Sequence, residues 1–256
     1  MENYKYLLIE RQEKVGIIQL NRPERRNALN VPMMTEIVNA LKELDSDNQI
    51  GAAVISSAVP GIFCAGGDLT ESVYPDLARQ WQRNDHLAHL WLAFNSVGII
   101  VISAVNGIAL GGGTGIVACS DLAIASEDAQ FGFPEIGLNS FPSTISPRLV
   151  RQCIGIRKCW EYILTGERFD ASEAERLGLI NKVVPGETLK ETTINLARKI
   201  ADKNCFAMRA GKRYFNSIQE MSYAEAVNYS VEFLTIVNSG KESIEAKKAF
   251  LNRKKQ

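Results

Sequence analysis

Asn106-Gly-Ile-Ala-Leu-Gly-Gly-Gly-Thr-Gly115 decides the fold, because it places five glycines within nine residues of an apolar region. An apolar run, Ile99 to Val105, precedes it, and a small apolar segment, Ile116 to Cys119, follows it. This order predicts a strand, a tight glycine turn and the start of a helix. A helix start presents free backbone N–H groups and the positive end of the dipole, and glycines there let a ligand approach the backbone. The stretch therefore indicates a site for a negative oxygen, with a turn that only needs positive φ as the alternative.

Length and composition bound the class of protein. A chain of 256 residues is long enough for one large domain, or for one domain with an appendage. Its formal net charge is zero, so it lacks the basic footprint of a nucleic-acid binder. No apolar run approaches the roughly 20 residues of a membrane span, so no membrane contact is expected. Acidic and tyrosine residues within Met1 to Glu10 argue against a signal peptide, and we expect a cytoplasmic protein.

The cysteines and histidines indicate neither a disulfide framework nor a metal site. The five cysteines are Cys64, Cys119, Cys153, Cys159 and Cys205. Their number is odd and no two are spaced as CxxC, so we expect reduced thiols. His86 and His89 could share a helix face, but no partner is evident at ligand spacing, and no metal is expected.

Strands and helices alternate in the first part of the chain. Strands are expected at 6–10, 15–20, 52–56, 99–105 and 122–125, and Asn30 is a candidate cap for a helix with apolar residues at helical spacing. This alternation predicts an α/β fold with largely parallel strands. Helices are expected at 189–201, 206–218, 223–237 and 244–252. We therefore divide the chain into a core, residues 1–195, and a helical region, residues 196–256.

A second glycine-containing turn, Phe63-Cys-Ala-Gly-Gly-Asp68, also follows a buried strand. Two such turns at strand ends could each offer one N–H to a single oxygen. This arrangement is an oxyanion hole, in which one donor is worth about 3–4 kcal/mol of barrier.

With these two turns, the chain resembles the crotonase (enoyl-CoA hydratase/isomerase) superfamily over essentially its whole length. The resemblance is carried, in family order, by Leu20 to Asn30, Phe63 to Asp68, Ala104 to Gly113, Phe131 to Leu138, Leu164 to Gly166 with Ala174 to Ile180, and Ala249 to Lys254. It implies a spiral of ββα turns followed by a C-terminal helical region that drives trimer formation. A homotrimer or a dimer of trimers is therefore expected.

The resemblance also implies site residues. It makes Ala65 and Gly112 the two N–H donors to a thioester oxygen of an acyl-CoA substrate. The residues implied in coenzyme A binding are Arg25, Asn27, Ala28, Leu29, Gly67, Asp68, Phe250, Arg253 and Lys254, of which the last three could reach a neighbouring subunit's nucleotide. Arg25, Arg26 and the tail cations suit its phosphates, with a solvated charged surface as the alternative. Coenzyme A is part of the substrate, so no separate cofactor is expected.

The catalytic acids are where the sequence departs from the family's hydratases, which use two glutamates. The position of the first is Gly115, and that of the second is Glu135. A family isomerase would place a further carboxylate at Ser143, which also lacks an acid. Apolar neighbours such as Phe131 and Phe133 would raise the pKa of Glu135 and suit it to act as a base, although a loop salt bridge is the alternative.

One remaining carboxylate slightly favours double-bond isomerisation over hydration. A glutamate can take a proton from one carbon and return it to another, whereas addition of water is usually served by two acids. Two alternatives stay open: a hydratase that uses another acid, such as Glu71 or Asp76, and a non-catalytic acyl-CoA-binding or scaffold protein. A dinucleotide loop is disfavoured because the glycines do not fall as GxGxxG.

Overall fold

The computed structural model describes residues 4–73, 76–203 and 205–253. Its strands are β1 (Leu7–Gln12), β2 (Val15–Leu20), β3 (Ala52–Ser57), β4 (Gly61–Cys64), β5 (Ile100–Val105), β6 (Gly107–Leu110), β7 (Leu122–Ser126), β8 (Gln130–Gly132), β9 (Arg168–Asp170) and β10 (Lys182–Val184). Its α-helices are α1 (Val31–Ser46), α2 (Leu77–Ser96), α3 (Gly112–Cys119), α4 (Ser146–Arg148), α5 (Ile156–Thr165), α6 (Ala171–Arg176), α7 (Leu189–Ala201), α8 (Cys205–Ile218), α9 (Tyr223–Ser239) and α10 (Lys241–Arg253).

The strands form two sheets, and from β3 to β8 consecutive strands alternate between them. The larger sheet has the order β1-β2-β3-β5-β7-β10, and the smaller one β4-β6-β8-β9. Among the described residues, only the β1–β2 and β8–β9 strand pairs are antiparallel. Thus β3, β5 and β7 join the large sheet, while β4, β6 and β8, the next strands in the chain, join the small one. The result is the predicted ββα spiral with largely parallel strands, and it brings the ends of β4, β6 and β8 side by side.

The large sheet is buried on both faces, as parallel strands usually are. One face packs against α1, α2 and α3, and Ile18, Ile55 and Phe94 belong to that core. The other face packs beneath α7, with Ile17, Val54 and residues of that helix in a second, smaller cluster. Adjacent residues of one strand, such as Ile17 and Ile18, therefore enter different cores.

Local signals placed several elements correctly. The Asn30 side chain accepts a hydrogen bond from the Met33 N–H and caps α1, as predicted. The expected strand at 99–105 is present as β5, but the sequence did not predict β6, which starts only two residues after β5 ends. The glycine turn therefore follows β6 rather than β5.

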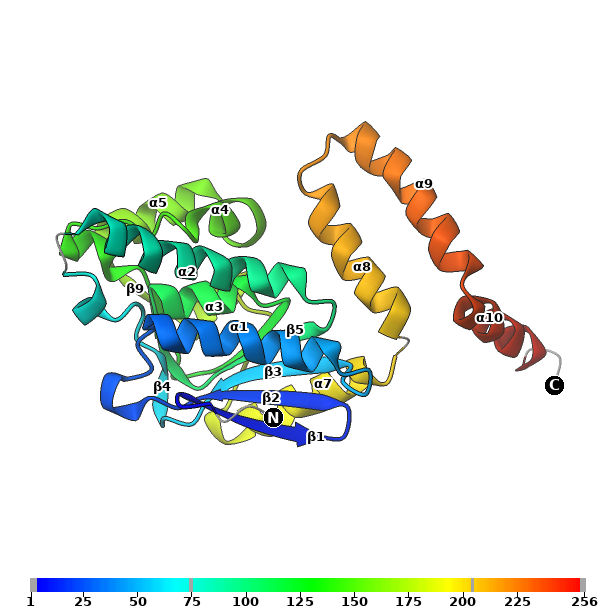
Figure 1. The fold of residues 1–256 in the computed structure, drawn as a ribbon, viewed down its shortest axis with the longest axis horizontal. Coiled ribbons are helices and arrows are strands. Elements are labelled where there is room, and N and C mark those ends of the chain that lie inside the picture. Colours follow the sequence, from blue (N-terminus) through cyan, green and yellow to red (C-terminus); the bar gives the residue numbers. More distant parts are fainter. Residues whose placement is uncertain (1–3, 74–75, 204, 254–256) are drawn as a thin grey trace.

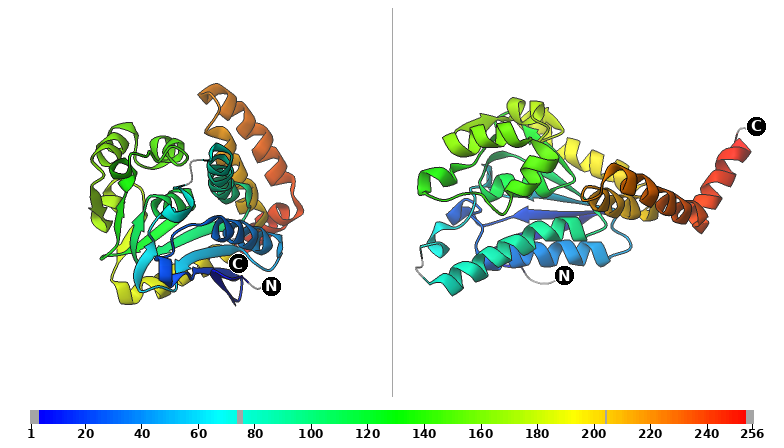
Figure 2. Two further views of the ribbon diagram at one scale, coloured as in Figure 1. Left: turned by 60° about the vertical axis from the view of Figure 1, so that its left-hand side comes forward. Right: turned by 90° about the horizontal axis from the view of Figure 1, so that it is seen from above.

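The last three helices extend away from the sheets (Figures 1 and 2). Helix α8 is tied to the core because Arg209 pairs with Asp45 at 2.5 Å, and the buried Lys212 pairs with Asp121 at 2.7 Å. By contrast, none of the α9 residues is buried. The predicted boundary at residue 195 falls inside α7, whose Ala197 and Ala201 pack against the sheet. No helix within the described ranges is both long and apolar enough to cross a membrane.

Candidate active site

The first turn of the site lies between β6 and α3. Gly111 has a φ of +51°, in the region that favours glycine, and its N–H donates to the Gly132 carbonyl at 2.9 Å. The buried Thr114 hydroxyl donates to the Ala109 carbonyl at 2.7 Å and holds the start of the helix against its own strand. Gly112 is the first residue of α3, and its N–H has no acceptor in the described part of the chain. It is therefore free for an external oxygen.

The second turn follows β4. The Ala65 N–H donates to the Arg26 carbonyl at 3.0 Å, so it is not available to a thioester oxygen, and the prediction for Ala65 is corrected on this ground. The next peptide groups pair with Leu29, whose N–H donates to the Gly66 carbonyl at 2.7 Å and whose carbonyl accepts from Asp68 at 2.9 Å. In an extended chain, the N–H groups of successive residues point in opposite directions. The Asp68 N–H points toward Leu29, so the Gly67 N–H points away from it.

The two turns meet at their free N–H groups. A Cβ placed on Gly112 would lie 3.7 Å from the Gly67 nitrogen, and one placed on Gly66 would lie 3.6 Å from the Gly112 nitrogen. Gly66 has a φ of +105°, and its Cβ would lie 2.9 Å from the Leu110 carbonyl, so only glycine allows this approach. As with Gly112, the Gly67 N–H has no acceptor among the residues that the structure describes. Gly67, predicted only to line the coenzyme A path, is thus positioned to be the partner donor of Gly112.

Glu135 lies directly over the first turn. It belongs to the short 3-10 helix Pro134–Leu138, which follows β8, and β8 pairs with β6. A Cβ on Gly111 would lie 2.5 Å from the Glu135 Oε1 atom, so the carboxyl group rests on the residue before Gly112. Its Oε2 atom is buried without a hydrogen-bond partner in the described ranges, and burial raises the pKa of this carboxyl. The expected raised pKa of Glu135 is therefore found, and the described residues form no salt bridge with it; its role as acid and base stays a prediction.

The space beside Gly115 is filled by Trp91 of α2. A Cβ on Gly115 would lie 2.7 Å from Cη2 and 2.9 Å from Cζ2 of this indole. Trp91 is 6% exposed, and its Nε1 donates to the Thr144 hydroxyl at 3.1 Å, so the ring is fixed. Ser143, the other position checked for an acid, is exposed. The sequence carried no signal for this contact, because Trp91 has only the helical spacing of an ordinary core residue.

The acids that could replace the missing carboxylate have other partners. Glu71 accepts a hydrogen bond from the Val31 N–H at 2.9 Å, at the start of α1. Asp76 caps α2 by accepting from the Ala78 N–H at 2.9 Å. Both carboxylates therefore accept hydrogen bonds from N–H groups at the starts of helices.

Several residues predicted to bind coenzyme A have structural contacts instead. The Asn27 side chain is fully buried and donates to Ser57 and Phe63 at 2.8 and 2.9 Å, so it cannot contact a ligand. Asp68 is 4% exposed and pairs with the buried Arg22 at 2.7 Å. Burial alone would raise the pKa of Asp68, but hydrogen bonds from Thr70 and Arg22 outweigh it and the pKa is lowered.

The other predicted contacts differ in how accessible they are. Leu29 is buried and Ala28 half-buried, whereas Arg25 and Arg26 are exposed on the loop before α1. Phe250 is 60% exposed on α10. This helix lies at the opposite end of the molecule from α5 (Figure 1). Arg253 ends α10, and Lys254 lies outside the described residues. Because α10 also lies away from α3 in Figure 1, its described residues are not brought to this chain's own glycine turns.

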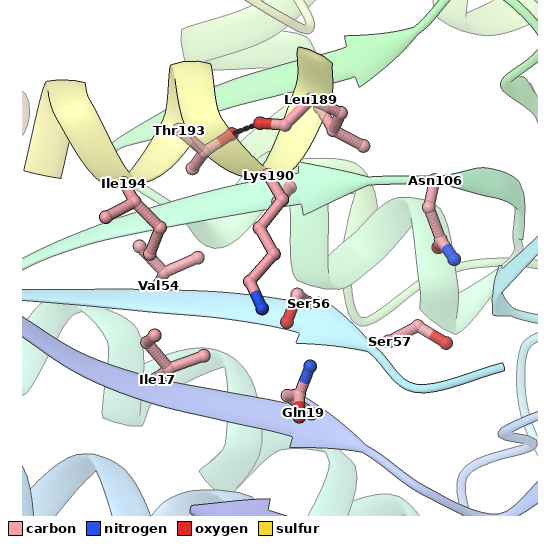
Figure 3. A pocket seen from close by; sticks show the side chains of 11 residues that line it. Ile17, Gln19, Val54, Ser56, Ser57, Asn106, Leu189, Lys190, Thr193 and Ile194 are labelled. Atoms are coloured by element: carbon pink, nitrogen blue, oxygen red, sulfur yellow. Dashed lines mark hydrogen bonds between the residues drawn. The ribbon is translucent and has the colours of Figure 1, made fainter. Parts of the chain in front are cut away.

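A separate pocket of about 100 Å³ lies on the other face of the large sheet, beneath α7 (Figure 3). It is lined by Ile17, Gln19, Val54, Ser56, Ser57, Ala104, Asn106, Leu189, Lys190, Thr193 and Ile194. It contains no carboxylate and none of the predicted site residues. It therefore lacks the chemistry that the two glycine turns and Glu135 bring together.

Comparison with known proteins agrees with the fold. Residues 10–256 match the family model described as enoyl-CoA hydratase/isomerase. A probable enoyl-CoA hydratase of Mycobacterium bovis is 36% identical, over 98% of this chain and 96% of its own. The 2,3-dehydroadipyl-CoA hydratase of Escherichia coli is 32% identical, over 97% of this chain and 96% of its own.

The solved structures give the same result. A crystal structure of an enoyl-CoA hydratase from Mycobacterium smegmatis superposes with a TM-score of 0.92 at 31% identity, covering 97% of this chain and 96% of that one. The family model and the full-length relatives both support one assignment. The chain belongs to the enoyl-CoA hydratase/isomerase family, whose enzymes act on CoA thioesters.

Proposed function

We propose that the protein binds an acyl-CoA thioester with its carbonyl oxygen between the N–H groups of Gly67 and Gly112. Both N–H groups are free of acceptors in the described residues, and the two turns approach each other closely. When a proton leaves the carbon next to the thioester, negative charge develops on this oxygen, and each donor stabilises it by about 3–4 kcal/mol. Gly112 also supplies the positive end of the α3 dipole.

Glu135 is proposed as the acid and base. As a carboxylate it takes a proton from C2 of a 3-enoyl thioester, which leaves a dienolate held by the two N–H groups. The resulting carboxylic acid then returns the proton to C4, giving the 2-enoyl isomer and restoring the carboxylate. The raised pKa of Glu135 supports this cycle, because an acid that titrates nearer to neutral pH exchanges protons more readily with carbon. These steps use only protein groups and the substrate.

The position of Trp91 is the observation that favours isomerisation over hydration in this proposal. Its indole fills the space into which a side chain at position 115 would extend, so the chain has neither the first hydratase acid nor room for it. Glu71 and Asp76 do not replace it in this proposal, because each is held at a helix start. Hydration is the second candidate, since the full-length relatives are named hydratases.

The test compares trans-3-hexenoyl-CoA with crotonyl-CoA as substrates for the wild type, Glu135→Gln and Glu71→Gln. We expect isomerisation to exceed hydration, Glu135→Gln to lose at least about 10²-fold in turnover, and Glu71→Gln to keep its rate.

Folding of Glu135→Gln is checked by its melting temperature, which should not fall, because a raised carboxyl pKa means that the fold disfavours the charged form. Rapid hydration of crotonyl-CoA, or a fully active Glu135→Gln, would contradict the assignment. Loss of hydration in Glu71→Gln would instead identify that residue as the second acid. Binding without any turnover would favour an acyl-CoA-binding homologue.

We also propose self-association, as a trimer or a dimer of trimers. The support is the set of exposed apolar side chains on a helix without buried residues: Val227, Val231, Leu234 and Ile236 of α9 are 45%, 63%, 57% and 63% exposed. Such faces are usually covered by another subunit. In this assembly, Arg25 and Arg26 of one chain and the α10 residues of a neighbour would contact the phosphates of coenzyme A.

A further inference from the structure

Arg83 of α2 is the cation next to the proposed oxyanion hole. It lies two helical turns before Trp91, so both side chains lie on the face of α2 that is turned toward the core, together with Leu90. A Cβ on Gly67 would lie 2.5 Å from the Arg83 Nη2 atom. The guanidinium group therefore rests against the residue whose N–H is the proposed donor, and the absence of a side chain at Gly67 makes room for it.

Arg83 has no carboxylate partner among the described residues. Its Nε is buried without an acceptor, and Nη1 makes only a 3.4 Å contact with the neighbouring Asn84. The acid nearest to it in sequence, Asp85, lies 3.2 Å from the His89 Nδ1 atom, and Asp76 and Glu71 accept hydrogen bonds from N–H groups at helix starts. A buried guanidinium nitrogen without a partner is costly, and an anion that arrives with the ligand would satisfy it.

The acyl group is the better source of that anion than the phosphates of coenzyme A. The same face of α2 continues to Trp91, which contacts α3 and binds Thr144. This face thus covers the side of the site where the acyl chain would lie. The exposed cations suited to phosphates, Arg25 and Arg26, lie on a different segment, before α1.

We propose that Arg83 binds a carboxylate on the acyl group, so that the site prefers CoA thioesters of short dicarboxylic acids. This inference rests on the proposed function, because it needs the thioester oxygen at Gly67 and Gly112. The planar guanidinium fork matches a carboxylate with two parallel hydrogen bonds. A carboxylate a few carbon atoms from the thioester would reach Arg83 while the thioester oxygen contacts the neighbouring Gly67 N–H.

The experiment measures binding rather than turnover, by titration calorimetry with glutaryl-CoA and pentanoyl-CoA. The two saturated ligands have the same number of acyl carbons and differ in a terminal carboxylate against a methyl group. We expect the wild type to bind glutaryl-CoA at least about tenfold more tightly. Arg83→Met should remove this preference and leave pentanoyl-CoA binding unchanged. Arg83→Lys, which keeps the charge but not the fork, should retain part of it. The matched control is Arg79→Met, one turn earlier on α2, and it should keep the full preference.

Three outcomes would overturn the inference. The first is equal affinity of the wild type for glutaryl-CoA and pentanoyl-CoA. The second is an equal loss of affinity for both ligands in Arg83→Met, which would place Arg83 on the coenzyme A moiety. The third is a preference for glutaryl-CoA that survives in Arg83→Met. Failure of the proposed function has a different signature. In that case neither thioester binds the wild type, or both bind but Glu135→Gln retains full turnover.

Discussion

Gly115→Ala tests the contact on which the single-acid proposal depends. The added methyl would lie 2.7 Å from Cη2 of Trp91, a ring held by burial and by its hydrogen bond to Thr144. Overpacking of this kind costs about 1–3 kcal/mol. Against it, alanine in the interior of α3 gains about 0.5–1 kcal/mol over glycine from helix propensity. The clash is the larger effect, so we expect a net loss of up to about 2.5 kcal/mol.

The sign should reverse when the indole is removed. In a Trp91→Leu background the clash disappears and the helix preference remains, so Gly115→Ala should stabilise by about 0.5–1 kcal/mol. The four proteins form a double-mutant cycle that isolates the contact from the cost of Trp91→Leu itself. Thermal unfolding by calorimetry measures it, because each kcal/mol shifts the Tm of a chain of this length by about 2–4 °C. If Gly115→Ala has the same effect in both backgrounds, Trp91 does not fill this space and the argument for one acid loses its basis.

Further predictions concern pH, a buried ion pair and assembly. Because burial raises the pKa of Glu135, kcat/KM for isomerisation should fall as pH drops through a value above 4.5, the usual pKa of glutamate. A pH profile of kcat/KM whose acid limb lies at or below 4.5 would contradict the raised pKa. Asp68→Asn breaks the buried pair with Arg22 and should cost about 3–5 kcal/mol in urea unfolding at neutral pH. Because folding lowers the pKa of Asp68, the wild type should keep this stabilisation at neutral pH and lose it as pH falls through the lowered pKa. If Asp68→Asn is as stable as the wild type, the pair is not formed. Val231→Glu on α9 should convert a trimeric or hexameric mass in light scattering into a monomer, and a monomeric wild type at micromolar concentration would refute the assembly.

The sequence predicted what local interactions determine. Asn30 caps its helix because its side chain bonds to an N–H three residues away, and that pattern is visible in the sequence. The strand at 107–110 was not predicted, because its short apolar run lies within the glycine stretch and almost continues the strand before it.

The identity of the second N–H donor depended on distant pairing. Whether Ala65 or Gly67 offers its N–H is fixed by hydrogen bonds to Arg26 and Leu29, residues far away in sequence that the local pattern does not specify. Likewise, the contact of Trp91 with Gly115 joins two helices, and nothing in either helix specifies which residues face each other. The segments of the site were thus predictable, whereas the direction of single groups within it was not.

In the proposed assembly, the lack of buried residues on α9 would link the order of the C-terminal segment to the amount of protein present. A helix that gains its cover from another chain is stabilised by mass action, so its opening free energy rises with the logarithm of the protein concentration. Helix α8 would not follow this rule, since Arg209 and Lys212 attach it to its own core. On dilution, amide hydrogens of α9 should exchange faster while those of α8 keep their protection, and proteases should then cut first between residues 219 and 241.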